Sequence, residues 1–302
     1  MTAPHGFAAA PEGTAREDAP ATPSTRAEAL EKGITLLLAQ MTVEDKVAQM
    51  HGRGLVKGVF RTPDNERLGI PGFAMVDGPR GVTAIAGNGT AFPVSMARGA
   101  TWDTALEERV GEAIGREAKA RTANVLLAPT INILRHPRWG RAQETYGEDA
   151  VHIGRMGVAF IRGAQRHVIA SVKHFAVNSI ENVRNEVDVL VDERTLREVY
   201  LPHFRMAVED ARVGSVMLAY NKVNGRYCAE NTHLLRDILK GEWGFQGFVE
   251  SDWDLGTRST APSALAGLDI EMPKPVFYGA ALLAAVAAGD VEETVLDDAV
   301  RR

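Results

Sequence analysis

The chain has 302 residues, of which 45% are hydrophobic and 24% charged, as is typical of a globular protein. Its formal net charge of −5, without a basic stripe, argues against nucleic-acid binding and permits a neutral substrate. The sequence has no apolar run of the ~18 residues that a membrane span needs, no recognisable secretory signal and one cysteine, Cys228; we therefore expect a disulfide-free cytoplasmic protein.

Residues 1–28 differ in composition from the rest of the chain. They contain four of the fourteen prolines, little bulky apolar content and no periodic pattern. Such a segment cannot bury enough surface to compensate for the entropy lost on ordering. We therefore predict a disordered leader over 1–28 and one ordered domain over 29–302.

Strands and helices are predicted to alternate beyond the leader. Helices begin after the capping residues Thr42, Asp103 and Asp192, and another spans about 150–166. Short apolar runs that end in polar or glycine-containing turns predict buried strands at 71–78, 124–132, 167–175, 214–221, 247–253 and 265–273. Alternation indicates parallel βα units, in a barrel or an open doubly wound sheet. Six strand candidates favour an α/β fold of the (β/α)8 TIM-barrel type, with irregular or missing first units.

In such barrels the chemistry lies at the carboxyl ends of the strands. The residues that follow the predicted strands there include two acids, several cations, and aromatic or soft apolar side chains. Carboxylates and cations hydrogen-bond sugar hydroxyls, and aromatic groups cover the apolar face of a sugar ring. The pattern indicates a site for a polyhydroxylated ring and implies no cofactor. Its residues are Asp77, Arg141, Lys173, His174, Met217, Tyr220, Asp252 and Trp253.

Six segments resemble the linked signatures of glycoside hydrolase family 3 and occur in that family's order, within a resemblance running from about residue 42 to the C-terminus. They are DGPRG (77–81), HPRWGRAQETYGED (136–149), SVKHFAVN (171–178), DERTLREVYLPHF (192–204), SVMLAYNKVNG (215–225) and GFVESDW (247–253). The resemblance implies an exo-acting retaining β-glycosidase that forms a covalent glycosyl-enzyme. The full set favours a β-glucosidase or β-xylosidase type over β-N-acetylhexosaminidases.

The resemblance also implies a role for each site residue. Asp252 matches the nucleophile, and Asp77 matches the carboxylate that holds hydroxyls on the far side of the sugar. Arg141, Lys173 and His174 match the cationic cluster that grips neighbouring hydroxyls. Met217, Tyr220 and Trp253 match the walls of the terminal sugar site.

Two structural expectations follow for Lys173 and His174. Adjacent strand residues point to opposite faces, so family members bring both to the sugar through a non-proline cis peptide, which we expect here. A nucleophile must stay ionised, and we expect Lys173 and Arg141 to lower the pKa of Asp252. Arg141 could instead serve only a salt-bridged loop network with Glu144.

The general acid that a retaining glycosidase needs is missing from the matched motifs. Two-domain family members take it from a following sandwich domain, and β-N-acetylhexosaminidases take it from a loop whose motif KHFAVNSIENVRNEVDV (173–189) does not match. We therefore expect a barrel truncated before a sandwich domain or dependent on a partner chain, with weak activity alone. Glu250 could substitute, but we expect it to pair with a barrel cation.

Two other functions remain open from the sequence. The chain could be a catalytically crippled sugar-binding barrel, or Lys173 could form a Schiff base in a lyase or aldolase. The histidines show no metal-ligand spacing. The identity of the sugar (glucose, xylose or galactose), its aglycone and the oligomeric state are not determined by the sequence.

Overall fold

The computed structural model describes residues 23–83 and 89–302. Most of the predicted leader, residues 1–22, lies outside this range. Residues 23–28 do not belong to a leader as predicted, because helix α1 (Pro23–Leu38) begins there. A proline is well tolerated in the first turn of a helix, so its presence did not mark an irregular segment.

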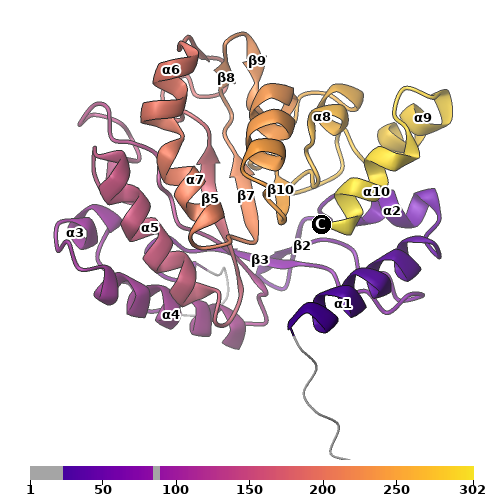
Figure 1. Cartoon of the computed structure of the whole chain (residues 1–302), viewed down its shortest axis with the longest axis horizontal. Coiled ribbons are helices and arrows are strands. Elements are labelled where there is room, and N and C mark those ends of the chain that lie inside the picture. The colour runs from indigo at the N-terminus through magenta and orange to yellow at the C-terminus, as the bar shows by residue number, and fades with distance from the viewer. Residues whose placement is uncertain (1–22, 84–88) are drawn as a thin grey trace, which may run out of the picture.

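The centre of the molecule is a parallel sheet that the sequence predicted (Figure 1). Five strands pair side by side in chain order: β3 (Ala74–Asp77), β4 (Val125–Leu127), β5 (Ile169–Phe175), β7 (Ser215–Leu218) and β10 (Phe248–Glu250). The first units are irregular, as expected. Strands β1 (Leu55–Val56) and β2 (Val59–Arg61) form an antiparallel ribbon that pairs with β3.

The sheet closes into a barrel through residues 269–272. Ile270 bridges Glu250 of β10, and Glu271 bridges His51. Arg53 N–H then donates to Arg61 O at 2.7 Å, which returns the ring to β2. The last predicted strand, 265–273, is therefore shorter than expected, because its first residues belong to helix α8 (Ala261–Ala266).

Helices surround this barrel between the strands. The larger ones are α4 (Thr104–Ala120), α5 (Ala150–Ala164), α7 (Pro202–Glu209), η4 (His233–Glu242), α9 (Ala280–Ala288) and α10 (Glu293–Arg301). Short ones are α2 (Val43–Gln49), α3 (Ser95–Gly99), η1 (Ala142–Glu144), α6 (Glu193–Thr195), η2 (Leu196–Tyr200) and η3 (Cys228–Glu230). The predicted caps are confirmed: Thr42, Asp103 and Asp192 each accept a backbone N–H of the first helical turn.

Two glycines allow α4 and α5 to pack in close contact. A Cβ atom at Gly111 of α4 would lie 2.3 Å from the carbonyl oxygen of Phe160, and one at Gly163 of α5 would lie 2.0 Å from that of Glu108. Any larger residue would push the helices apart.

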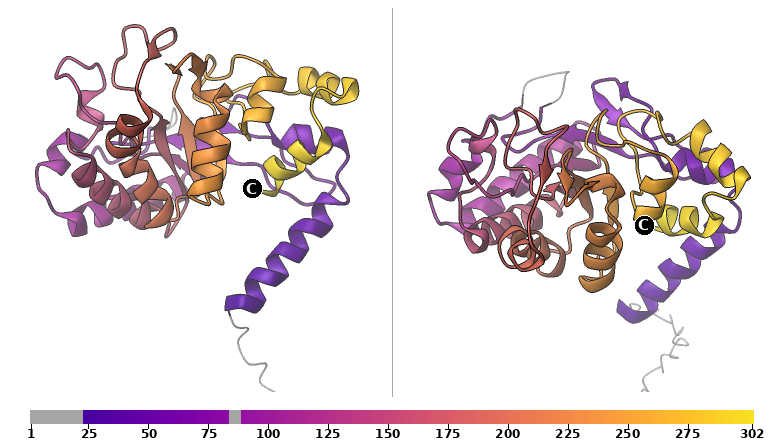
Figure 2. Two further views of the ribbon diagram at one scale, coloured as in Figure 1. Left: turned by 45° about the horizontal axis from the view of Figure 1, so that its top comes forward. Right: turned by 90° about the horizontal axis from the view of Figure 1, so that it is seen from above.

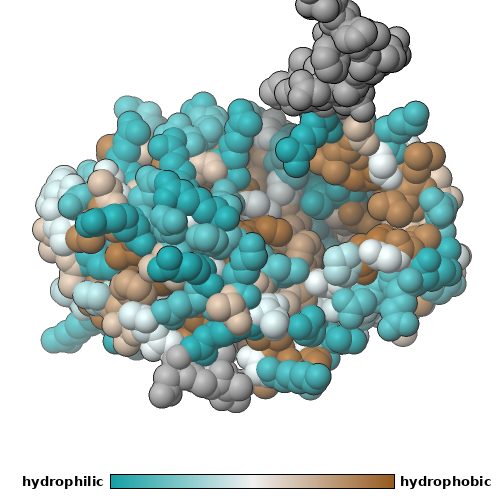
Figure 3. All heavy atoms as spheres, turned by 90° about the horizontal axis from the view of Figure 1, so that it is seen from below, coloured by the Kyte–Doolittle hydropathy of each residue, from teal (hydrophilic) through white to brown (hydrophobic). Residues whose placement is uncertain are grey.

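Helix α1 lies against α10 at the edge of the barrel (Figure 2), where Arg301 pairs with Glu31. Leu30, Leu36 and Leu37 of α1 are exposed. Figure 3, viewed from below, shows hydrophobic surface interspersed with charged groups on this side. A hollow of about 760 Å³ also lies at the amino ends of the strands, lined by aromatic residues such as Phe73, Trp243 and Phe248. Within the described residues no helix is long and apolar enough to cross a bilayer.

The loops at the carboxyl ends of the strands include a small second sheet. It consists of β6 (Asp188–Val189), β8 (Lys222–Val223) and β9 (Arg226–Tyr227). Cys228, which follows β9, is fully buried, and burial raises the pKa of its thiol to about 12. The carboxyl end of the barrel is thus covered by ordered loops, and the predicted site residues lie there.

Candidate active site

A cavity of about 220 Å³ opens at the carboxyl ends of the strands. Its volume suits one sugar ring better than a longer oligosaccharide, because drug-sized ligands occupy roughly 300–1,000 Å³. All eight residues predicted for the site line it, and three that the sequence did not indicate join them. The lining residues are Phe60, Asp77, Leu127, Arg141, Lys173, His174, Arg184, Met217, Tyr220, Asp252 and Trp253.

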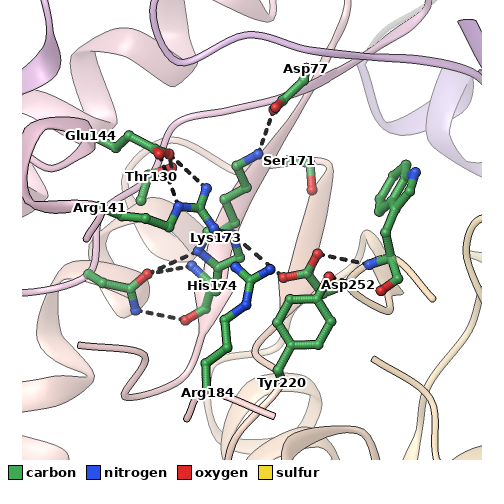
Figure 4. Close-up of polar contacts among 12 residues, drawn as sticks. Asp77, Thr130, Arg141, Glu144, Ser171, Lys173, His174, Arg184, Tyr220 and Asp252 are labelled. Atoms are coloured by element: carbon green, nitrogen blue, oxygen red, sulfur yellow. Dashed lines mark hydrogen bonds and ion pairs between the residues drawn. The ribbon is translucent and has the colours of Figure 1, made fainter. Parts of the chain in front are cut away.

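Asp252 follows β10 at the base of the cavity and is 7% exposed. Its Oδ1 accepts the backbone N–H of Trp253 at 2.8 Å, while its Oδ2 has no hydrogen-bond partner (Figure 4). Oδ1 thus accepts a backbone hydrogen bond, whereas Oδ2 is enclosed without a hydrogen-bond partner.

The pKa of Asp252 lies above its ordinary value, contrary to our expectation. Burial raises it, and this effect exceeds the lowering by the Trp253 N–H, Lys173, Tyr220 and Arg141. Lys173 and Arg141 therefore act in the predicted direction, but they offset only part of the desolvation.

Lys173 and Asp77 form an ion pair across the cavity, with Nζ and Oδ1 separated by 2.6 Å (Figure 4). Desolvation raises the pKa of Asp77, but the charges of Lys173 and Arg141 outweigh it and hold this pKa below its ordinary value. Asp77 therefore remains a carboxylate, which can accept hydrogen bonds from hydroxyl groups.

The Lys173–His174 peptide bond is cis, as predicted. Both side chains line the cavity, and His174 is 1% exposed. Its Nε2 lies 2.8 Å from a terminal nitrogen of Arg141 and 3.7 Å from Asp252 Oδ2. Burial, together with the nearby cations, lowers the pKa of His174 well below its ordinary value, so the ring is neutral.

Arg141 takes part in both arrangements that the sequence left open. It pairs with Glu144 through two nitrogens, at 3.0 and 2.7 Å, and it also lines the cavity and contacts His174. The pairing with Glu144 holds the planar guanidinium in one orientation.

Aromatic side chains form the wall beside Asp252. The hydroxyl of Tyr220 donates to the carbonyl oxygen of Trp253 at 2.8 Å, and the Trp253 ring meets Phe60 edge-on at 5.1 Å between centroids. Arg184 lies 4.4 Å from the centroid of the Tyr220 ring and pairs with Glu181. These contacts fix the rings that would pack on a sugar.

The three additional residues were missed for identifiable reasons. Phe60 lies on β2, a strand that the sequence did not predict. Leu127 ends β4, within the longer strand predicted at 124–132, and pairs in register with Asp77. Arg184 lies nine residues beyond the end of β5, too far along the loop for the strand-end rule to indicate it.

The expected pairing of Glu250 with a barrel cation is wrong. Its Oε1 accepts from the hydroxyls of Ser171 and Ser215, at 2.5 and 3.3 Å, and it does not line the cavity. Burial raises its pKa to about 7, although the two hydroxyls and the charge of Lys173 act to lower it. In residues 23–83 and 89–302 no group of His, Cys, Asp and Glu is arranged to hold a metal ion.

Comparison with known proteins identifies relatives over nearly the whole described chain. Residues 27–302 match the model of the glycosyl hydrolase family 3 N-terminal domain. A β-glucosidase of Rhizobium radiobacter is 45% identical over 88% of this chain, and thermostable β-glucosidase B of Acetivibrio thermocellus is 42% identical over 89%. The chain spans only 33% and 37% of these two relatives.

Solved structures agree with this result. β-Glucosidase 3B of Thermotoga neapolitana, in complex with α-D-glucose, superposes with a TM-score of 0.85 and is 38% identical. The match covers 89% of this chain and 41% of that protein.

Proposed function

Because the chain belongs to glycosyl hydrolase family 3, whose N-terminal domain it matches over residues 27–302, we propose that it is the nucleophile-bearing barrel of a retaining β-glucosidase. The observation that carries the proposal is Asp252, whose carboxylate lines a cavity of monosaccharide size together with Asp77, Arg141 and Lys173. The names of the relatives favour a β-glucoside as substrate.

The proposed chemistry has two steps. A carboxylate oxygen of Asp252 attacks the anomeric carbon and forms an acetal-ester bond to it, while the bond to the leaving oxygen breaks and that oxygen takes a proton from a general acid. Water then attacks the same carbon, releases Asp252 and gives net retention of configuration. Asp77, Lys173 and the neighbouring arginines bind the hydroxyls during both steps.

We propose that the general acid is supplied from outside these 302 residues. Retaining enzymes place it ~5–5.5 Å from the nucleophile. Of the carboxyls considered above, Asp77 is held ionised by Lys173 and Glu250 is sealed inside the barrel. The proposal is compatible with a chain that spans about a third of the first relatives' length.

Trapping of the covalent glycosyl-enzyme tests the assignment of Asp252 as the nucleophile. A 2-deoxy-2-fluoro glucoside with a dinitrophenolate leaving group needs no protonation, so the chain should form a stable adduct even without a general acid. Peptide mass spectrometry should locate the added mass on the peptide containing Asp252. Asp252→Asn should form none.

The matched control is Asp254→Asn, which changes an exposed carboxyl two residues away. Asp254 has a φ of 58°, a conformation that asparagine tolerates well, so this variant should label at the parental rate. An adduct on another residue would refute the assignment of Asp252.

Two other outcomes correspond to the alternative functions. Saturable glucose binding without any adduct would support a sugar-binding barrel. Trapping of a carbonyl compound on Lys173 by borohydride would support a Schiff-base enzyme. The ion pair with Asp77 argues against the latter, because it stabilises the ammonium rather than the neutral amine that a Schiff base requires.

A further inference from the structure

Asn132 lies behind the site, does not line the cavity and is 2% exposed. Its amide makes a two-point contact with the backbone of His174. Nδ2 donates to His174 O at 2.8 Å, and Oδ1 accepts His174 N–H at 2.8 Å. This contact fixes the orientation of the amide, because the reverse orientation would place donor against donor and acceptor against acceptor.

The same Oδ1 lies 3.3 Å from Nδ1 of the His174 ring. A carbonyl oxygen can only accept, so Nδ1 must carry the proton of the imidazole. On the opposite side of the ring, Nε2 lies 2.8 Å from Arg141, whose guanidinium can only donate. Nε2 must therefore be the unprotonated nitrogen. Asn132 and Arg141 impose the same tautomer.

The charged groups around His174 keep it neutral. Arg141, Lys173 and Arg184 face it as cations, and burial adds to their effect on its pKa. The facing anion is Asp252, whose Oδ2 is 3.7 Å from Nε2. Since Nε2 has no proton in this tautomer, the contact is not an ion pair, and Oδ2 is left without a donor.

We propose that Asn132 is a positioning residue that locks His174 in the neutral Nδ1–H tautomer and so keeps an N–H donor and a positive charge away from the carboxylate of Asp252. In the other tautomer, or as an imidazolium, His174 would turn an N–H toward Oδ2, 3.7 Å away, and lose its contact with Arg141. An N–H dipole or a positive charge this close would stabilise the carboxylate of Asp252 and so weaken it as a nucleophile. The role in attack rests on the proposed function, whereas the tautomer does not.

Nitrogen-15 NMR of the histidine-labelled chain tests the tautomer directly. The ring signals of His174, assigned as those missing from a His174→Phe variant, should show a protonated Nδ1 and an unprotonated Nε2 between pH 5 and 8. A protonated Nε2 or an imidazolium near neutral pH would overturn the proposal. This measurement needs no enzymatic activity, so its outcome can be distinguished from a failure of the proposed function.

Asn132→Asp tests the consequence for Asp252. The new carboxylate still accepts from Nδ1, but its charge favours the imidazolium, as carboxylate–histidine pairs do. The rate of labelling by the fluoro glucoside, divided by the parental rate, should then fall about tenfold for each pH unit below the pKa that His174 has in the variant. The ratio should recover at higher pH.

Asn231→Asp is the matched control. Asn231 is also buried and makes the same kind of two-point backbone contact, accepting from Leu234 N–H and donating to Val223 O, but it does not contact His174. Its labelling ratio should not depend on pH. If the labelling ratio depends on pH equally in both variants, or not at all in Asn132→Asp, the role of Asn132 in attack is rejected. The NMR result on the parental chain decides the tautomer even if a variant does not fold.

Discussion

Glu250 and Asp252 lie two residues apart on one strand end, and burial raises the pKa of both, but different neighbours oppose that effect. Glu250 accepts from two serine hydroxyls through Oε1, but burial outweighs their effect and raises its pKa to about 7. Asp252 faces a backbone N–H and several cations, which stabilise a carboxylate. Environment rather than residue type thus separates a structural acid from the proposed nucleophile.

Replacement of Glu250 by Gln should change how stability depends on pH. The pKa of Glu250 is about 7 in the folded chain, against 4.5 ordinarily. An acid whose folded pKa is raised stabilises fully below its unfolded pKa, and this contribution is lost as pH rises through the folded value. The difference in unfolding free energy, Glu250→Gln minus parent, should rise by up to about 3 kcal/mol from pH 4 to 8.

Urea unfolding at several pH values measures this difference. Glu66→Gln, which changes an exposed carboxyl, is the control and should show a flat difference. A flat difference for Glu250→Gln as well would mean that the Glu250 carboxyl ionises freely in the folded barrel.

Replacement of Asp77 by Asn should weaken sugar binding. It removes the partner of Lys173, which is 3% exposed, and an acceptor for hydroxyl groups. Loss of a charged hydrogen bond costs about 1.5–3 kcal/mol, so the Kd for glucose should rise roughly 10- to 150-fold. Calorimetric titration measures this, with exposed Asp64→Asn as the control; equal affinities would exclude Asp77 from the sugar site.

The eight expected site residues were predictable because each follows a strand or belongs to a motif with a fixed place in the chain. Asn132 was not, because its role depends on a contact with His174, 42 residues away, that no local pattern encodes. Glu250 was assigned the wrong partner for the same reason. Its serine partners lie on two other strands, and their hydroxyls face it only once the barrel has closed.

At the level of elements, the parallel strands and capped helices were predictable from local chemistry. Apolar runs end where the strands end, and Asp103 and Asp192 accept from the first helical turns. The two-residue strands β1, β6, β8 and β9 were not predicted, because such short segments carry no periodic pattern. Pairing with distant segments alone defines them.

Gly111→Ala should separate α4 from α5. The added methyl group would lie 2.3 Å from a backbone oxygen that cannot rotate away, so we expect a loss of about 1–3 kcal/mol or more in unfolding free energy. Gly33→Ala in α1 meets nothing within 4 Å and should instead gain up to about 1 kcal/mol from helix propensity. Denaturant unfolding compares the two variants. An unchanged free energy of unfolding for Gly111→Ala would show that α4 and α5 can move apart without cost.

For the whole molecule, closure depends on the segment 269–272 that joins the last strand to His51. Asp269 is 1% exposed and holds this segment in place through Lys240, at 2.6 Å, and through the N–H of Val249, at 2.7 Å. Because the site residues come from strands all around the ring, closure is a condition for the cavity itself.

Asp269→Ala should therefore be strongly destabilising. Lys240 would keep only the more distant Asp298, at 3.8 Å, and removal of one partner from a buried ion pair costs about 3–5 kcal/mol. Glu198→Ala, which breaks the exposed pair with Arg194 at 3.1 Å, is the control and should change little. Thermal unfolding of both variants measures the contrast, and similar melting temperatures would contradict a role for Asp269 in closure.

The burial of Cys228 makes the native chain unreactive toward maleimides, although it contains a thiol. A cysteine introduced at an exposed position such as Ile180, in the loop that carries Arg184, should therefore accept a fluorophore without prior removal of Cys228. Conversely, the rate at which Cys228 itself is modified would report how often the barrel opens. Bound sugar should lower this rate.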